Sequence, residues 1–184
     1  MKLDKNFFSE NIKTLIYALI IAVIIRSLLV QPFYIPSSSM EPTLLVGDRL
    51  FVTKYSYGYS KHSFPFSPPI LNKRIMFRSP ERGDVIVFKT PADNRTDYIK
   101  RIVGLPGDEI QFIEGDLFLN KRKTEKKKIY IKKNIFCGNK ESNVTFYEEN
   151  LANKKKYTIV YNSIGSMINS DKYTVPKNHY FLLG

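Results

Sequence analysis

The chain has 184 residues, 43% of them hydrophobic, and a formal net charge of +12. This length fits a membrane anchor plus one domain, and the hydrophobic content is sufficient for a packed core. Residues 121–133 hold eight Lys/Arg and one Glu, so +7 of the +12 lies in one local segment. No nucleic-acid-binding module accompanies that charge, which argues against a nucleic-acid partner.

An almost wholly apolar run occupies residues 12–30. As a helix it would be about 28 Å long, close to the thickness of the bilayer's hydrocarbon core. The lysines before the run predict that residues 1–11 are cytoplasmic and that residues 31–184 lie on the other side. The sequence therefore predicts a transmembrane anchor over residues 12–30.

Two alternatives to this anchor are a cleavable signal peptide and the buried core helix of a soluble protein. Ser37-Ser38-Ser39 resembles a cleavage site because its residues are small. It lies beyond the end of the apolar run, however, and directly after Pro36. An uncleaved single anchor is the preferred interpretation.

After Pro32 the sequence predicts short strands and turns, which indicates a mainly β domain. The predicted strands cover residues 48–55, 84–89 and 98–103, followed by a hairpin over residues 109–120. Prolines, glycines and aromatic residues make residues 58–80 a predicted loop that touches the membrane, and Gly104–Asp108 a turn. Residues 121–174 are rich in lysine and asparagine and are predicted to be an insertion in the β domain.

The lysine-rich residues 121–133 are predicted to form a solvated loop or a hairpin flank. Attraction to anionic lipid headgroups is the alternative. The single cysteine, Cys137, cannot form an intramolecular disulfide and is interpreted as a small core residue. Neither His62 nor His179 has a metal-ligand spacing to Cys137, so no metal or other cofactor is predicted.

A serine becomes a strong nucleophile only when a base removes its proton. Lysine can be that base if burial lowers its pKa toward neutrality. Lys100 lies between Ile99 and Ile102 in a predicted apolar strand, and alternation along the strand would point Arg101 to the opposite face. From these residues alone, a solvent-exposed lysine and an ordinary serine loop are open alternatives.

The motifs in combination resemble the bacterial type I signal peptidases, membrane-bound serine–lysine endopeptidases that remove signal peptides. The matching pieces come in the family's order behind the anchor: Gln31–Leu44 with Ser37-Ser38-Ser39-Met40-Glu41-Pro42, Gly47-Asp48, Arg82–Phe88, Tyr98–Asp108, and Tyr180–Gly184. The resemblance implies a signal-peptidase-like β catalytic core, the bacterial inner membrane, and signal peptides and membrane phospholipids as partners.

The resemblance also implies roles for individual residues. Ser39 corresponds to the nucleophile and Lys100 to the general base, while the Ser37 hydroxyl and the Ser39 backbone N–H form the oxyanion hole. Shallow pockets that accept small residues at the first and third positions before the cut correspond to Phe33, Ile35, Leu44, Val87, Tyr98 and Ile99. The alternative for each pocket residue is an ordinary core position.

The chain ends at Gly184, the position where the family continues as Gly-Asp-Asn-Arg-Asp-Asn-Ser. We therefore expect an incomplete core, and a truncated chain that is weakly active or inactive. One alternative is a remnant that binds signal peptides or partners without cleaving them. Another is a self-cleaving serine–lysine repressor, which the membrane run and the lack of a helix-turn-helix disfavour.

Overall fold

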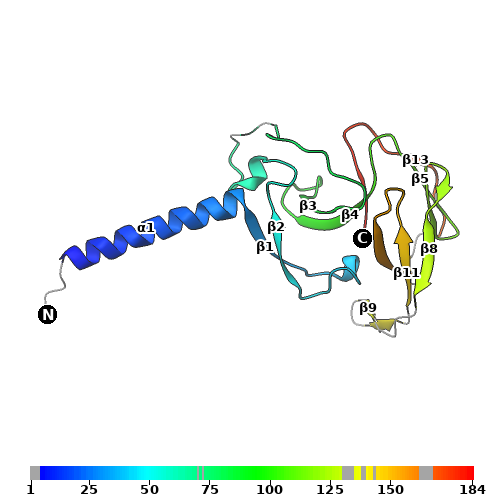
Figure 1. Cartoon of the computed structure of the whole chain (residues 1–184), viewed down its shortest axis with the longest axis horizontal. Helices are drawn as coiled ribbons and strands as arrows, with labels where there is room; N and C mark the ends of the chain where they lie inside the picture. Colours follow the sequence, from blue (N-terminus) through cyan, green and yellow to red (C-terminus); the bar gives the residue numbers. More distant parts are fainter. Residues whose placement is uncertain are drawn as a thin grey trace. The chain divides into compact units, whose positions relative to one another are not determined.

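The computed structural model of the chain describes residues 5–69, 71, 73–129, 135–137, 140–142, 144–161 and 168–184. It divides into two compact units, one formed by Met1–Phe33 with Arg49–Ser79 and the other by Tyr34–Asp48 with Pro80–Gly184. Within the described residues, one long helix precedes a series of antiparallel strands (Figure 1). The prediction of a mainly β chain behind one N-terminal helix is confirmed.

The first unit begins with helix α1, Lys5–Leu28. Among the described residues, its segment Ser9–Leu28 is the one helix long and apolar enough to cross a membrane. The Tyr59 hydroxyl donates to the Leu28 carbonyl at 2.9 Å, and the Lys54 N–H donates to the Leu29 carbonyl at 3.0 Å. These bonds supply partners for carbonyls that the end of a helix leaves without them.

The helix differs at both ends from the predicted span of residues 12–30. It begins at Lys5, and the chain is already extended at Val30, the first residue of β1 (Val30–Tyr34). Pro32 explains the early end, because proline has no N–H to donate and disfavours the helical conformation of the residue before it. Strand β1 pairs with β2, Arg49–Thr53.

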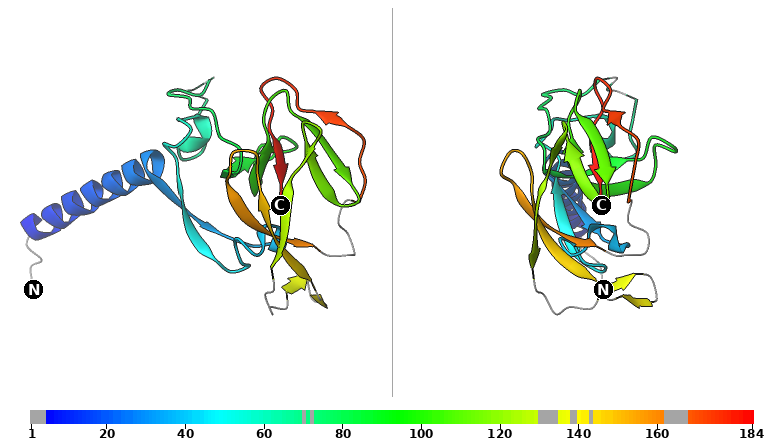
Figure 2. Two further views of the ribbon diagram at one scale, coloured as in Figure 1. Left: turned by 45° about the vertical axis from the view of Figure 1, so that its right-hand side comes forward. Right: turned by 90° about the vertical axis from the view of Figure 1, so that its right-hand side faces the viewer.

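The second unit contains most of the strands (Figure 2). Its sheets have the orders β14-β4-β3, β13-β5-β6-β7, β12-β11-β8 and β10-β9. The strands are β3 (Val85–Lys89), β4 (Asp97–Gly104), β5 (Glu109–Ile113), β6 (Asp116–Leu119), β7 (Arg122–Lys123), β8 (Glu125–Ile129), β9 (Ile135–Cys137), β10 (Lys140–Ser142), β11 (Thr145–Asn150), β12 (Lys156–Tyr161), β13 (Tyr173–Thr174) and β14 (Phe181–Leu183).

The core of this unit joins strands from two sheets with residues that lie just outside strands. Six buried apolar side chains form it: Val103, Ile110, Leu117, Leu119, Leu151 and Val175. Val103 ends the apolar half of β4, so one strand supplies both core contacts and the predicted base at residue 100. Ile102 and Val103 are fully buried, and this packing holds the backbone of β4 in place.

The turn Gly104–Asp108 lies where the sequence predicted it. One oxygen of Asp108 accepts from the Leu105 N–H at 2.6 Å and from Arg82 at 2.8 Å, and the other accepts from Asn120 at 2.8 Å. Burial alone would raise the pKa of Asp108, but the hydrogen bonds from Asn120, Leu105 and Arg82 outweigh it and lower that pKa. The carboxylate therefore stays ionised and holds three segments together.

The predicted strands and the hairpin are confirmed within a residue or two at each end. The predicted loop 58–80 contains a short 3-10 helix, Lys61–Ser63, and one bridge between Tyr59 and Ile75. In the lysine-rich segment, residues 125–129 are not a loop but strand β8, which pairs with β11. The Lys126 amine contacts Asp116 at 2.6 Å, so a charge partner as well as a strand partner orders this segment.

Cys137 lies in β9, but its side chain is outside the described part of the structure. The assignment of Cys137 to the core stays a prediction. The same holds for the domain boundaries, including the insertion over residues 121–174. That range contains the three-stranded sheet β12-β11-β8.

Candidate active site

The serine motif lies in a loop of the second unit that closes on itself. The Ile35 N–H donates to the Asp48 carbonyl at 3.0 Å, and the Gly47 N–H donates to the Ile35 carbonyl at 2.9 Å. Ile35 and Met40 are buried, so they hold the loop from both sides of the serines. Ser38–Met40 form a single 3-10 turn, which fixes the backbone of the central serine.

The three serines differ in exposure. Ser37 is exposed, whereas Ser38 and Ser39 are half-buried. The hydroxyl oxygens of Ser37 and Ser39 lie 3.4 Å apart, longer than an ordinary hydroxyl hydrogen bond but on the same side of the turn. The structure therefore brings together the two serines to which the resemblance assigns roles, and leaves Ser38 out of the contact.

Lys100 lies in β4, between its two partner strands. Ile86 of β3 lies opposite Lys100. Strand β14 pairs with the other edge of β4, where Leu183 lies opposite Arg101. A Cβ atom added to Gly184, the residue after β14, would come within 2.7 Å of the Lys100 amine nitrogen and 3.1 Å of the Met40 sulfur. The lysine amine thus lies beside the residue that follows Ser39.

Burial lowers the pKa of Lys100 below its ordinary value of 10.5. Within the described residues the Lys100 amine forms no ion pair that would oppose this shift. Loss of water favours the neutral amine, the form that can accept a proton. The environment of Lys100 therefore shifts its pKa in the direction that a general base needs.

Arg101 contacts different segments from its neighbour, as alternation along the strand predicts. Its guanidinium donates to the Gly83 carbonyl at 2.8 Å and lies over the ring of Tyr157 at 4.4 Å. Nothing in the sequence distinguishes Tyr157 from the other tyrosines of the lysine-rich residues 121–174. Gly184, Met40 and Tyr157 are the site neighbours that sequence reasoning missed.

The predicted pocket residues are distributed over several elements. Ile35 is fully buried and Leu44 half-buried in the serine loop, and Phe33 belongs to the first unit. Val87 and Ile99 are cross-strand partners, on the face that alternation gives to Arg101. Tyr98 shares the face of Lys100 and packs edge-on against Phe88 at 6.1 Å. Their role in substrate binding stays a prediction.

If Lys100 is the general base that the resemblance implies, alanine in place of Gly184 should lower kcat by roughly tenfold to a hundredfold, because a displaced base costs about that much. The new methyl group would occupy the space of the Lys100 side chain, whose flexible end can move aside. Stability should change little for that reason. Steady-state cleavage kinetics and thermal unfolding measure the two effects separately.

Gly104→Ala is the contrasting control. Its methyl group would meet Ile110 at 2.4 Å and Phe181 at 2.8 Å, inside the packed core. Overpacking of this kind destabilises by about 1–3 kcal/mol. Equal losses of stability in the two variants, with kcat unchanged in Gly184→Ala, would contradict the position given to Lys100.

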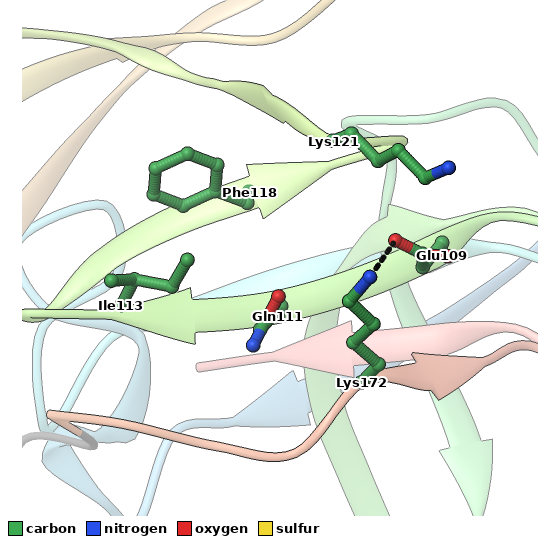
Figure 3. A pocket seen from close by; sticks show the side chains of 6 residues that line it. All are labelled: Glu109, Gln111, Ile113, Phe118, Lys121 and Lys172. Carbon is green, nitrogen blue, oxygen red and sulfur yellow. Dashed lines mark ion pairs between the residues drawn. The ribbon is translucent and has the colours of Figure 1, made fainter.

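A shallow cavity of about 200 Å³ lies elsewhere, on the outer face of β5 and β6 (Figure 3). Glu109 and Lys172 form an ion pair at 3.6 Å at one end of it, and Ile113 and Phe118 line the other end. Neither Ser39 nor Lys100 lines this cavity. Among the described residues, no group of three or more His, Cys, Asp or Glu side chains could hold a metal ion.

Comparison with known proteins decides the family. Residues 8–184 match the family described as Signal peptidase, peptidase S26. The chain belongs to the S26 signal peptidase family. The resemblance drawn from the serine and lysine motifs is thereby confirmed, and the N-terminal apolar helix agrees with the single-pass anchor of that family.

Individual signal peptidases show the same likeness. The chain is 38% identical over 187 residues to Signal peptidase I of Rickettsia bellii (strain OSU 85-389), covering 96% of this chain and 63% of that protein. It is 39% identical over 179 residues to Signal peptidase I of Rickettsia conorii, covering 91% and 65%. For Signal peptidase I of Rickettsia typhi the values are 37% over 177 residues, 91% and 66%. The chain thus spans slightly less than two thirds of the length of these relatives.

Proposed function

We propose that this chain is a membrane-anchored endopeptidase that removes signal peptides, with Ser39 as nucleophile and Lys100 as general base. The observation that carries the proposal is the common contact of Gly184 with the Lys100 amine and Met40. It puts a partly desolvated amine beside the residue next to Ser39. Family membership supports the type of reaction.

In the proposed reaction, neutral Lys100 takes the proton from the Ser39 hydroxyl as its oxygen attacks the scissile carbonyl carbon. The negative charge on the carbonyl oxygen is stabilised by the Ser39 backbone N–H and the Ser37 hydroxyl. Lys100 then gives the proton to the leaving amine, which frees the C-terminal product and leaves an ester on Ser39. A water molecule then loses a proton to Lys100 and attacks the ester carbonyl. Lys100 returns that proton to the Ser39 oxygen as the carbon–oxygen bond of the ester breaks and the signal peptide leaves with a free carboxyl group.

Substrate selection is proposed to come from shallow apolar pockets lined by the residues predicted for that role in the second unit, Ile35, Leu44, Val87, Tyr98 and Ile99. Shallow walls admit alanine and exclude larger side chains because the core behind them is closely packed. An extended signal peptide can lie along a strand edge, held by main-chain hydrogen bonds. Ile35, which is fully buried, supports a closed floor under such a pocket.

The proposed location is the bacterial inner membrane, with α1 spanning it and the N-terminus in the cytoplasm. The apolar segment Ser9–Leu28 supports a single span. Lysines before the span support the orientation, by the bias of positive charge toward the cytoplasmic side. Phospholipids would then be the immediate surroundings of α1.

The experiment is cleavage of two matched signal-peptide substrates by the protein in phospholipid vesicles. One peptide has alanine at the first and third positions before the cut, and the other has leucine at both. We expect cleavage of the alanine peptide alone, and mass spectrometry of rapidly quenched samples should find the acyl group on Ser39. Equal cleavage of both peptides, or acylation elsewhere, would refute the proposal. Tight binding of the alanine peptide without cleavage would favour the non-cleaving remnant instead.

A further inference from the structure

Arg101 follows the proposed base in β4, and its side chain contacts three separate segments of the second unit. One guanidinium nitrogen donates to the Gly83 carbonyl at 2.8 Å, and another donates to the Thr43 hydroxyl at 3.3 Å. The guanidinium carbon lies 4.4 Å from the centre of the Tyr157 ring. Because Thr43 belongs to the loop of the proposed nucleophile, one side chain connects that loop to the strand of the proposed base.

Tyr157 is held rigidly on the other side of this contact. It lies in β12 opposite Glu149 of β11, and its hydroxyl donates to the Glu149 carboxylate. Glu149 is 4% exposed and also accepts from the Thr124 hydroxyl at 2.8 Å. Burial, followed by the charge of Glu149, raises the pKa of Tyr157, so its ring stays neutral. A fixed neutral ring is a good surface for a partly desolvated guanidinium.

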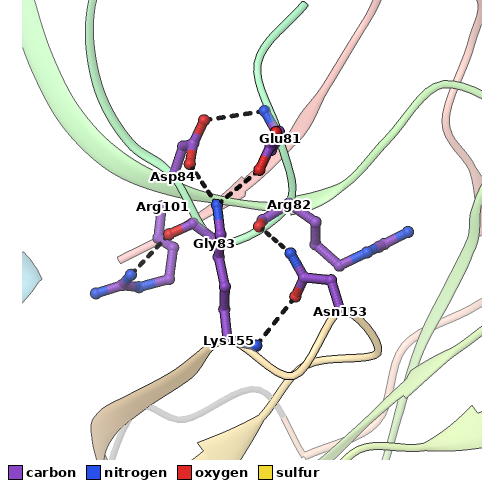
Figure 4. Close-up of polar contacts among 7 residues, drawn as sticks. All are labelled: Glu81, Arg82, Gly83, Asp84, Arg101, Asn153 and Lys155. Atoms are coloured by element: carbon purple, nitrogen blue, oxygen red, sulfur yellow. Dashed lines mark hydrogen bonds and ion pairs between the residues drawn. The ribbon is translucent and has the colours of Figure 1, made fainter.

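The turn between β11 and β12 forms ion pairs and a hydrogen bond with the segment before β3 (Figure 4). The Lys155 amine lies 2.8 Å from Asp84 and 3.1 Å from Glu81, and the Asn153 amide donates to the Arg82 carbonyl at 2.7 Å. The glycine carbonyl that accepts from the guanidinium lies within this segment. The sheet β12-β11-β8 therefore holds both the ring and one hydrogen-bond acceptor of the guanidinium.

We propose that Tyr157 is a positioning residue for the proteolytic site. Its ring fixes the Arg101 guanidinium, and Arg101 holds the strand of Lys100 and the loop of Ser39 in register. This inference rests on the proposed roles of Ser39 and Lys100. It gives the lysine-rich sheet a role in the reaction although its side chains do not touch the reacting atoms.

The same sheet offers a matched control. The Lys126 amine lies over the ring of Tyr147 in β11, 4.9 Å from its centre. It is a tyrosine–cation contact of the same kind, yet its cation is Lys126 instead of Arg101. Leucine in place of either tyrosine removes a ring and one cation contact. Tyr157→Leu also removes the hydroxyl that donates to Glu149, and Tyr157→Phe, which removes that hydroxyl but keeps the ring, separates the two losses.

The experiment compares Tyr157→Leu, Tyr157→Phe and Tyr147→Leu in the full chain in phospholipid vesicles. We expect kcat for the alanine signal peptide to fall roughly tenfold to a hundredfold in Tyr157→Leu, with KM nearly unchanged. Tyr157→Phe keeps the ring and should retain most of the rate. Tyr147→Leu should retain both constants. The pH at which kcat is half-maximal should also shift in Tyr157→Leu alone, since the surroundings of Lys100 change.

A second measurement does not depend on cleavage. The amide hydrogens of Glu41 and Leu44 are bonded to the Ser38 and Met40 carbonyls at 2.9 and 3.0 Å. Tyr157→Leu should speed hydrogen exchange in the peptide that contains them, and Tyr147→Leu should not. Unchanged exchange and unchanged kcat in folded Tyr157→Leu, or equal changes in both variants, would overturn the positioning role.

The two proposals fail differently. Full cleavage by a Ser39→Ala variant would refute the proposed nucleophile, and the exchange measurement would still decide whether Tyr157 orders the serine loop. Conversely, normal dependence on Ser39 with no effect of Tyr157→Leu would refute the positioning role alone.

Discussion

Replacement of Ser39 by alanine is expected to reduce kcat by on the order of 10⁴-fold or more, the scale of losses when a serine protease loses its nucleophile. Alanine lacks the hydroxyl that would form the ester, and the 3-10 turn Ser38–Met40 with its buried Met40 keeps the backbone in place. Folding should be unaffected, since the residue is half-buried and its hydroxyl makes only a long contact. Cleavage of the alanine signal peptide in vesicles measures the rate, and circular dichroism checks the fold.

The adjacent serines are the matched controls. Ser38→Ala removes a hydroxyl from the neighbouring residue and should leave kcat nearly unchanged. Ser37→Ala should lower kcat by roughly a hundredfold, the typical loss of one oxyanion donor. A loss in Ser38→Ala as large as that in Ser39→Ala would show that the loop, and not one hydroxyl, determines activity.

The strands that carry the site were predictable because their pattern is local. Val85–Lys89 and Asp97–Gly104 are short apolar runs between turn residues, and the turn residues Gly104–Asp108 follow directly. Alternation along the strand predicts that Lys100 and Arg101 lie on opposite faces. The tyrosine contact of Arg101 and the burial of Lys100 agree with that separation.

Other features depend on contacts between distant residues and could not be read from the sequence. Val30 looked helical because it continues an apolar run, but its pairing with β2 and the nearby Pro32 make it extended. Residues 125–129 carry a loop-like composition, but β11 supplies a strand partner for them and Asp116 a charge partner for Lys126, while Lys127 and Lys128 are exposed. The contact of Gly184 with Lys100 joins residues 84 positions apart, which no local pattern encodes.

These two kinds of feature meet at the site. Local patterns placed the serine loop and the lysine strand correctly, while long-range contacts determine how far apart their reactive atoms lie. The glycine at residue 184 and the Arg101–Tyr157 contact act on that separation from opposite faces of β4. Substitutions at these positions should therefore change the rate more than the fold.

Replacement of Lys100 by methionine is expected to lower kcat at least about a thousandfold, because proton removal from a serine hydroxyl is then left to water. Methionine fills nearly the same volume, so the space beside Gly184 stays filled. Lys100→Arg should be equally inactive, since a guanidinium does not lose its proton in this pH range. Lys89→Met is the control, because the Lys89 amine is paired with Asp97 at 2.8 Å on the neighbouring strand.

The pH dependence follows from the direction of the pKa shift. Only the neutral amine accepts a proton, so kcat should rise with pH and level off above the pKa of Lys100, which burial places below 10.5.

A lysine whose pKa is lower in the folded state binds fewer protons there than in the unfolded state. Its contribution to stability therefore increases with pH between the two pKa values, and below both of them the burial of the charged amine opposes folding. Lys100→Met should accordingly be inactive yet at least as stable at pH 7 as the unsubstituted chain. Thermal unfolding of both proteins at pH 7 and pH 10 gives the stability of Lys100→Met relative to the parent at each pH. A lower relative stability at pH 7 than at pH 10 would contradict this environment.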